Sequence, residues 1–290
     1  MRKINGFDDF EIIDASEGHR LERWKDIILV RPDPQVIWNF SKKDYRWDNA
    51  NAVYHRSNKG GGYWEQLKKT PDVWQVSYGD LTFNLKPMGF KHTGLFPEQA
   101  VNWDVMREVI EKSKRPLKIL NLFAYTGGAT VACLKSGAAV THVDASKGMV
   151  QWAKENAASS GVADKQVRWL VDDCLKFVER EIRRGNRYDG IVMDPPSYGR
   201  GPNGEVWKLE QNLTELLISV SKVLADDAAF FILNSYTGGL SPTILNYMVK
   251  EIVVKNRKGE VTTEEIGIPV TKRNIVLPCG NTTMWINADI

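Results

Sequence analysis

The sequence of 290 residues contains little cysteine and no long apolar run. Its three cysteines, Cys133, Cys174 and Cys279, are far apart and form no C-x-x-C pair, so they predict neither a disulfide framework nor a zinc site. No apolar stretch approaches the roughly 18 residues of a membrane-spanning helix, and the N-terminal segment MRKINGFDDFEII lacks the apolar part of a signal peptide. We therefore expect a cytoplasmic protein with no membrane partner and no metal.

An excess of charge of one sign is also missing. The 39 Lys and Arg residues nearly balance the 36 Asp and Glu residues, and the net charge of +3 permits a nucleic-acid partner without requiring one. Hydrophobic residues at 42% and charged residues at 26% are ordinary values for a globular protein, and the chain is long enough for one large domain or two modest ones.

The dinucleotide-binding pattern G-x-G-x-x-G is absent from the stretch that is organised like a nucleotide-binding unit. That stretch predicts, in order, a strand at 119–123, a Tyr-Thr-Gly-Gly turn, a small-residue helix at 129–136, and a strand at 140–143. Asp144 follows the turn by roughly the 20 residues at which an acidic side chain accepts hydrogen bonds from ribose hydroxyls. We therefore predict a nucleoside ligand without phosphates; the alternative role for Asp144 is a cap for the next helix.

A second motif follows the apolar strand predicted at 191–193. It reads Asp194-Pro195-Pro196-Ser197-Tyr198. Two prolines directly after a strand remove two backbone donors and fix φ, so the chain leaves the sheet as a stiff arm that carries polar groups.

Together these motifs resemble the class I S-adenosylmethionine-dependent methyltransferases, and more closely the 23S ribosomal RNA large-subunit methyltransferase group. The likeness covers residues 86–290. Five motifs carry it in the family's order: HTGLFPEQ at 92–99, NLFAYTGG at 121–128, VDAS at 143–146, VDDCLKF at 171–177 and DPPSY at 194–198.

The alternation of predicted strands and helices after residue 117 indicates an α/β fold with a doubly wound, mainly parallel sheet. The last two predicted strands, Glu265–Val270 and Thr282–Ile286, have no helix between them and should form an antiparallel hairpin. This matches the antiparallel closing strand of the Rossmann-like methyltransferase sheet. The methyltransferase domain is expected at 87–290.

Residues 1–86 predict a small β-rich domain that ends in a hairpin around Gly79-Asp80. Within it, the stretch 39–70 interleaves Lys and Arg with Tyr and Trp. Such a stretch suits single-stranded RNA, and the alternative is a solvated loop whose aromatic residues pack on the domain.

The resemblance implies a set of cofactor-binding residues. Asp144 is assigned to the ribose hydroxyls, and Asp173 rather than Asp172 to the adenine amino group, with Asp172 as a helix cap. For Gln99 the alternative to cofactor binding is a helix cap, and for Tyr125 it is a packing role. The full set is Gln99, Phe123, Ala124, Tyr125, Thr126, Gly127, Asp144, Ala145, Ser146, Asp172, Asp173, Cys174 and Asp194.

The reaction leaves two candidate routes. For a nitrogen acceptor, the Asp194 carboxylate and the Pro195 carbonyl accept hydrogen bonds and orient the lone pair. For carbon 5 of cytosine, a thiolate must first add to carbon 6. Ser197 occupies the place of one family cysteine, so Cys279 is the remaining candidate nucleophile. We expect Cys279 in the hairpin loop, where Lys272 and Arg273 would lower its pKa.

The substrate predicted from the resemblance is a base of ribosomal RNA. The glycine-rich stretch 199–208 follows Asp-Pro-Pro, where an acceptor must enter, and is interpreted as a substrate loop. A protein or small-molecule acceptor, a nucleotide-binding oxidoreductase and a non-catalytic RNA-binding module are the alternatives. We expect a monomer or a homodimer.

Overall fold

The computed structural model describes residues 1–42, 44–57, 61–200 and 206–290. Contacts divide the chain into two compact units. The C-terminal unit comprises Met1, Asn102–Ile266 and Gly280–Ile290, and the N-terminal unit comprises Arg2–Val101 and Gly267–Cys279. Residues 87–101 and 267–279, which the sequence assigns to the methyltransferase domain, group by their contacts with the N-terminal unit.

The centre of the C-terminal unit is a parallel sheet with the strand order β11-β10-β9-β12-β15. β17 then pairs with β15 in the antiparallel direction. This is the doubly wound sheet with an antiparallel closing strand that the sequence predicted. The strand bounds are β9 Lys118–Leu122, β10 Ala139–Asp144, β11 Val167–Val171, β12 Gly190–Met193, β15 Phe230–Ser235 and β17 Ile275–Ile286.

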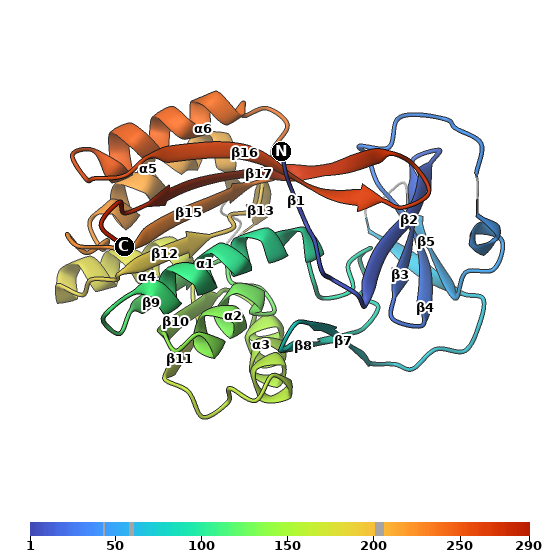
Figure 1. Cartoon of the computed structure of the whole chain (residues 1–290), viewed down its shortest axis with the longest axis horizontal. Helices are drawn as coiled ribbons and strands as arrows, with labels where there is room; N and C mark the ends of the chain where they lie inside the picture. The colour runs from blue at the N-terminus through green and yellow to red at the C-terminus, as the bar shows by residue number, and fades with distance from the viewer. Residues whose placement is uncertain (43, 58–60, 201–205) are drawn as a thin grey trace. The chain divides into compact units, whose positions relative to one another are not determined.

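Helices cover both faces of this sheet (Figure 1). Helices α4, α5 and α6 pack against one face through a large apolar cluster, and α1, α2 and α3 lie on the other. Both faces of β12 and β15 are buried, and these two strands are accordingly apolar over 190–193 and 230–233. The helix bounds are α1 Ala100–Lys112, α2 Gly128–Lys135, α3 Lys147–Ser159, α4 Cys174–Arg184, α5 Leu209–Ser221 and α6 Pro242–Met248, which continues as the π-helix η3 Val249–Val254.

The N-terminal unit is rich in antiparallel strands, as predicted. β2, β3 and β4 form a meander, and β7 and β8 form the expected hairpin. The described segment 35–38 forms no strand, although its sequence QVIW has β character, because a turn between Asp33 and Val36 interrupts the chain after Pro32. The bounds are β1 Arg2–Lys3, β2 Phe10–Ser16, β3 His19–Trp24, β4 Ile27–Pro32, η1 Tyr45–Trp47, β5 Ala52–Arg56, β6 Gly62–Gln66, β7 Trp74–Tyr78, β8 Leu81–Leu85 and η2 Pro97–Gln99.

The closing hairpin is longer than the sequence predicted. It consists of β16, Val261–Val270, and β17, Ile275–Ile286, and its turn lies at residues 271–274. The expectation that Cys279 lies in the hairpin loop is therefore wrong, because this residue is inside strand β17.

Candidate functional site

The predicted cofactor residues of the C-terminal unit meet at the carboxyl edge of the parallel sheet. In the strand register, Leu122 pairs with both Val143 and Met193, and Asp144 pairs with Val171. The segments that follow these four strands therefore begin side by side. Ligands of open α/β sheets bind at this edge.

The turn after β9 has an unusual backbone. Phe123 and Tyr125 have positive φ values of 55° and 50°, and Gly127 has a φ of 81°. Non-glycine residues adopt this region rarely and at a cost of about 1–3 kcal/mol, and such strain concentrates at ligand sites. A Cβ atom at Gly127 would lie 2.8 Å from the Cβ of Ala153, so only glycine fits there.

Asp144 connects this turn to the start of α3. Its Oδ2 accepts a hydrogen bond from the N–H of Tyr125 and its Oδ1 accepts one from the N–H of Ser146, both at 2.8 Å. Burial raises the pKa of Asp144, and these two hydrogen bonds oppose that effect. Ser146, and not Asp144, supplies the side-chain cap of α3 by accepting from the N–H of Met149.

The remaining residues of the turn are fixed by backbone contacts. Ala124 donates its N–H to the carbonyl of Val143 at 3.1 Å, and the carbonyl of Thr126 accepts from the side-chain amide of Asn156 at 2.8 Å. Both Ala124 and Thr126 are buried, whereas Ala145 is exposed. The turn therefore keeps its shape independently of any ligand.

Of the two aspartates after β11, the one that caps the next helix is not the one expected. Asp173 caps α4 by accepting from the N–H of Lys176 at 2.9 Å, whereas Asp172 forms an ion pair with Arg180. The assignment of the capping role to Asp172 is therefore wrong. Cys174 accepts a hydrogen bond from the N–H of Phe123 at 3.2 Å, and burial raises the pKa of its thiol, so it packs as an inert group.

The Asp-Pro-Pro arm leaves the sheet after β12. The N–H of Asp194 donates to the carbonyl of Leu122 at 3.3 Å, and the side chain of Asp194 is partly buried beside the fully buried Pro195. Ser197 accepts a hydrogen bond from the Thr237 hydroxyl at 2.7 Å. The arm is thus fixed at both of its ends.

A short hairpin follows the arm. β13, Tyr198–Arg200, pairs with β14, Val206–Lys208, and residues 201–205 of the predicted substrate loop lie outside the described residues. Trp207 donates its indole N–H to the carbonyl of Pro196 at 2.7 Å, and its ring lies 5.8 Å from that of Phe123. Trp207 therefore connects the hairpin to the turn after β9.

One polar network was missed by the sequence analysis. At the end of β15, the Asn234 Oδ1 accepts hydrogen bonds from the Asn102 side-chain amide at 3.0 Å and from the Thr282 hydroxyl at 2.8 Å. All three residues are buried. The signal was the polar pair Asn234-Ser235, which directly follows the apolar run Phe230–Leu233.

Gln99 and Cys279 belong to the N-terminal unit. Gln99 is buried in η2, directly before α1. Burial, and next the carboxylate of Glu98, raise the pKa of Cys279 well above its usual range. Lys272 and Arg273 lie instead within ion-pair distance of Asp44 and Asp14, so the expectation that they lower this pKa is wrong.

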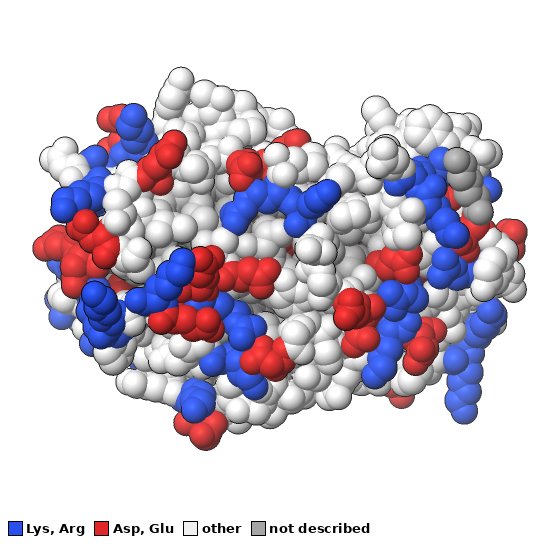
Figure 2. Space-filling model, in the orientation of Figure 1, with Lys and Arg blue, Asp and Glu red and all other residues white. Residues whose placement is uncertain are grey.

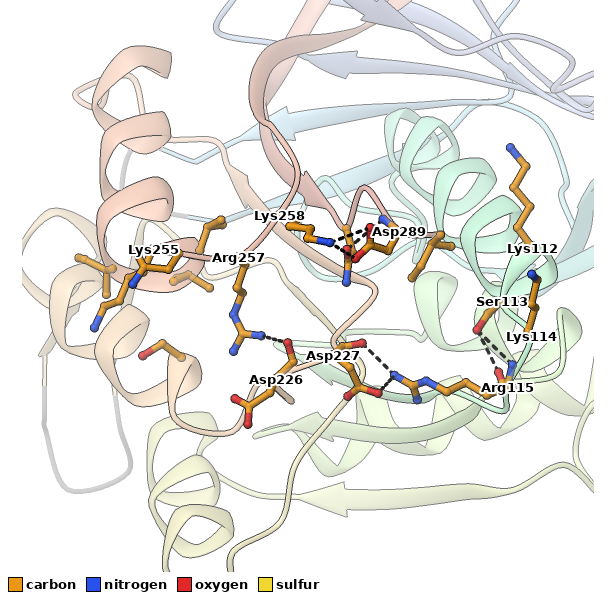
Figure 3. A pocket seen from close by; sticks show the side chains of 17 residues that line it. Lys112, Ser113, Lys114, Arg115, Asp226, Asp227, Lys255, Arg257, Lys258 and Asp289 are labelled. Carbon is orange, nitrogen blue, oxygen red and sulfur yellow. Dashed lines mark hydrogen bonds and ion pairs between the residues drawn. The ribbon is translucent and has the colours of Figure 1, made fainter.

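A pocket elsewhere in the C-terminal unit is lined mainly by charged and polar residues. This pocket, shown in Figure 3, lies where the parallel strands begin and is lined by α1, the residues before β15 and the segment after η3. Arg115 contacts Asp189 and Asp227, and Lys258 contacts Asp289. Since the motifs follow the opposite ends of the strands, this pocket is not the candidate site. Among the described residues, no group of His, Cys, Asp and Glu is suited to a metal ion, and none of the helices is long and apolar enough to cross a membrane.

Comparison with known proteins agrees with this architecture. A solved S-adenosylmethionine-dependent methyltransferase from Agrobacterium tumefaciens is 35% identical, with a TM-score of 0.93 over 98% of this chain and 92% of that one. A second solved structure, a putative methyltransferase complexed with S-adenosylhomocysteine, is 17% identical with a TM-score of 0.75, over 97% of this chain and 76% of that one, and shows the same fold.

Curated relatives carry the name ribosomal RNA large subunit methyltransferase K/L. The protein from Shewanella frigidimarina is 29% identical over 65% of this chain, and the one from Pseudoalteromonas atlantica is 32% identical over 57%. The chain spans 26% and 23% of their lengths. The family model for S-adenosylmethionine-dependent methyltransferases matches residues 51–236. The chain belongs to the S-adenosylmethionine-dependent methyltransferases.

Proposed function

We propose that this protein transfers a methyl group from S-adenosylmethionine to a nitrogen atom of a ribosomal RNA base. The names of the curated relatives support the RNA acceptor. The family membership argues against the oxidoreductase that the sequence left open. The observation that carries the choice of a nitrogen atom is the raised pKa of Cys279, which disfavours the thiolate that carbon methylation requires.

The residues at the carboxyl edge fit a nucleoside sulfonium cofactor. Each oxygen of the Asp144 carboxylate accepts one backbone N–H, and a carboxylate oxygen has capacity for a further hydrogen bond. Asp144 would therefore hold the ribose hydroxyls. The backbone of the turn at 123–127 would face the cofactor. The turn lacks the glycine pattern that binds a pyrophosphate, so it suits a cofactor without phosphates.

We assign the adenine end of the cofactor to residues 172–174. Asp172 and Asp173 follow β11 at the same edge as Asp144, and Cys174 contacts the turn after β9. Because the capping bond engages Asp173 Oδ1, its second oxygen is the acceptor we assign to the adenine amino group.

S-adenosylmethionine supplies an electrophilic methyl group, so the protein has to orient the acceptor. We assign this role to the Asp194 carboxylate and the Pro195 carbonyl, which accept hydrogen bonds from an amino group and direct its lone pair. The prolines make this arm stiff, and its bonds through Ser197 and Trp207 hold it in place. Such preorganisation reduces the entropic part of the barrier.

The acceptor class is tested by incubating the purified protein with S-adenosylmethionine that carries a tritiated methyl group. Ribosomal RNA, a protein extract and a small-molecule extract are offered separately under the same conditions. We expect label in the RNA fraction that is released by ribonuclease and resists protease. Label found only in the protein or small-molecule fraction would contradict the RNA acceptor.

A further inference from the structure

The loop at 86–93 presents an aromatic side chain on a fixed base in the N-terminal unit. Phe90 is 61% exposed. Beneath it, the indole N–H of Trp64 donates to the carbonyl of Met88 at 2.9 Å, and the Tyr54 hydroxyl lies 3.5 Å from the carbonyl of Gly89. An exposed aromatic ring held in this way loses little entropy when it binds a flat partner.

The loop is also closed by its own backbone. The N–H of Lys86 donates to the carbonyl of Thr93, and the N–H of Met88 donates to the carbonyl of His92, both at 3.1 Å. The Arg31 guanidinium donates to the carbonyl of Lys91 at 2.8 Å. Phe90 therefore lies at the tip of a fixed loop.

Arg56 lies at the side of this loop. Residue 56 pairs with Gly62 across the β5–β6 ladder, and the N–H of Ser57 donates to the carbonyl of Gly61 at 3.1 Å. The Phe90 ring in turn lies beside Gly61, because a Cβ atom there would be 3.9 Å from its Cε1. Phe90 and the exposed Arg56 thus flank the same two glycines.

The surroundings of the loop are electropositive. Burial, followed by the charges of Arg20, Arg31 and Arg56, lowers the pKa of Lys91 to about 8. Burial and the neighbouring cations also lower the pKa of His92, to about 4. Burial is the largest cause of both shifts, and the neighbouring cations act in the same direction.

The carboxylates near the loop balance only part of this charge. Glu22 forms ion pairs with Arg20 and Arg31, and Asp33 forms one with Arg20. Glu98 is buried, and burial raises its pKa, which favours the neutral acid. Four cations, Arg20, Arg31, Arg56 and Lys91, thus face two ionised carboxylates, and 4 − 2 leaves two positive charges.

We propose that Phe90 and Arg56 form a contact surface for a single-stranded segment of the RNA substrate. Phe90 stacks on an unpaired base, and Arg56, assisted by the field of Lys91, contacts the adjoining phosphate. An aromatic face beside cations is the usual combination for single-stranded RNA. The inference rests on the proposed RNA acceptor and identifies where the N-terminal unit touches it.

The stretch 39–70 that the sequence suggested for RNA contact includes Arg56 but not Phe90, and its residues Lys42, Arg46 and Trp47 are engaged within the protein. Arg46 is held by Asp44 through two hydrogen bonds, and Lys42 lies over the Trp47 ring and pairs with Glu17. These contacts support the packing interpretation for that part of the stretch.

Tyr63 provides a matched control. It is 63% exposed, on the same β5–β6 hairpin as Arg56, but on the opposite face, because side chains alternate along a strand. Its ring lies 5.2 Å from that of His55, which pairs with the acidic Glu65. An effect that merely reflects loss of an exposed ring would appear at both positions.

The test measures binding of a fluorescein-labelled single-stranded RNA by anisotropy at several salt concentrations. We expect Phe90→Ala to weaken binding by about 5- to 150-fold, the range for loss of one base stack, and Phe90→Trp to restore it. Arg56→Gln should reduce the salt slope by about one, whereas Tyr63→Ala should change neither quantity. Thermal unfolding by circular dichroism verifies that each variant is folded.

The two proposals fail in distinguishable ways. Equal RNA affinity in Phe90→Ala and Tyr63→Ala, with methylation of ribosomal RNA by the parent intact, overturns this surface alone. Binding of RNA that depends on Phe90, without methyl transfer to RNA, supports the surface and contradicts the proposed reaction. Absence of RNA binding by the parent protein, or binding of a protein partner through Phe90 in place of RNA, overturns the surface.

Discussion

One cluster of charged side chains in the N-terminal unit is buried, whereas the carboxylates at the site of the C-terminal unit lie at strand ends and bind backbone N–H groups. Glu22 is fully buried and contacts Arg20 and Arg31, which are 13% and 2% exposed. Asp144 and Asp173 instead order the turn after β9 and the first turn of α4. The difference separates a charge network that stabilises a unit from carboxylates that keep capacity for a ligand.

On the visible surface, acidic and basic side chains are interspersed, without a large region of one sign (Figure 2). Charge alone therefore does not identify a binding site on this face. Only local arrangements, such as the cations near Lys91, distinguish one region from another.

The largest effect on stability is expected from Glu22→Gln. Burial alone would raise the pKa of Glu22, but Arg20 and Arg31 hold it below its usual range. Removing this charge takes from the buried Arg31 its carboxylate partner and leaves Arg20 with Asp33 alone, which costs about 3–5 kcal/mol of unfolding free energy. Urea unfolding can be followed through Trp24, whose indole N–H donates to the Glu22 carboxylate at 3.0 Å.

The matched control is Glu17→Gln. Glu17 pairs with Lys42 at the surface, where the two side chains are 50% and 44% exposed. Its loss should cost less than about 1 kcal/mol. Equal losses of unfolding free energy in Glu22→Gln and Glu17→Gln would show that the buried network stabilises the protein no more than a surface ion pair does.

The next effect concerns cofactor affinity. Asp144→Ala should weaken binding of S-adenosylmethionine by about 1–3 kcal/mol, because hydrogen bonds to a charged acceptor are lost. Calorimetric titration measures this change. Ser241→Ala, which removes the side-chain cap of α6 in the same unit, should leave the affinity unaltered. If both variants bind as the parent does, Asp144 is not a ligand.

A smaller effect is expected in acid. Hydrogen bonds from Arg46 lower the pKa of Asp44 to about 2, compared with its usual value of 3.8. A group whose pKa is lowered by folding stabilises the protein at pH values above its pKa in the unfolded chain, and this stabilisation is lost as the pH falls. The contribution of Asp44 to the free energy of unfolding should therefore disappear between about pH 4 and pH 2. Its size is at most about 2 kcal/mol. Asp44→Asn should show a shallower loss of stability over that interval, and an unchanged slope would refute the assignment.

The smallest effect is expected for Cys279→Ser. If the thiol is not a nucleophile, methyl transfer should change less than about twofold, and RNA containing 5-fluorocytidine should form no covalent adduct. Denaturing electrophoresis detects such an adduct. An adduct with the parent that is missing in the variant would restore the thiolate route.

The fold of the C-terminal unit could be predicted because strand and helix patterns alternate regularly along its sequence. The residue at which the closing strand begins could not be predicted. Pro278 and Gly280 usually interrupt a strand, and the sequence therefore placed Cys279 in a loop. In the structure, β17 continues through both residues.

Site residues were predictable by position but less so by role. Asp172 and Asp173 are chemically identical neighbours, and which of them caps α4 depends on a one-residue difference in where the helix begins. The buried network was not predicted either, because charged residues such as Arg20 and Glu22 are mostly exposed in proteins and nothing in the sequence marks these two as buried. Only pairing with β4 brings Arg31 beside them.

The most direct test of the account uses S-adenosylmethionine with a deuterated methyl group, followed by mass spectrometry of the nucleosides from ribosomal RNA. We predict a nucleoside with the labelled methyl group on nitrogen. Asp194→Asn should lower the rate at which this nucleoside forms by about 10²- to 10³-fold, as removal of a preorganised polar group does. The control Asp164→Asn, at an exposed position, should not change this rate. A label on carbon, or an Asp194→Asn variant as active as the parent, would contradict the account.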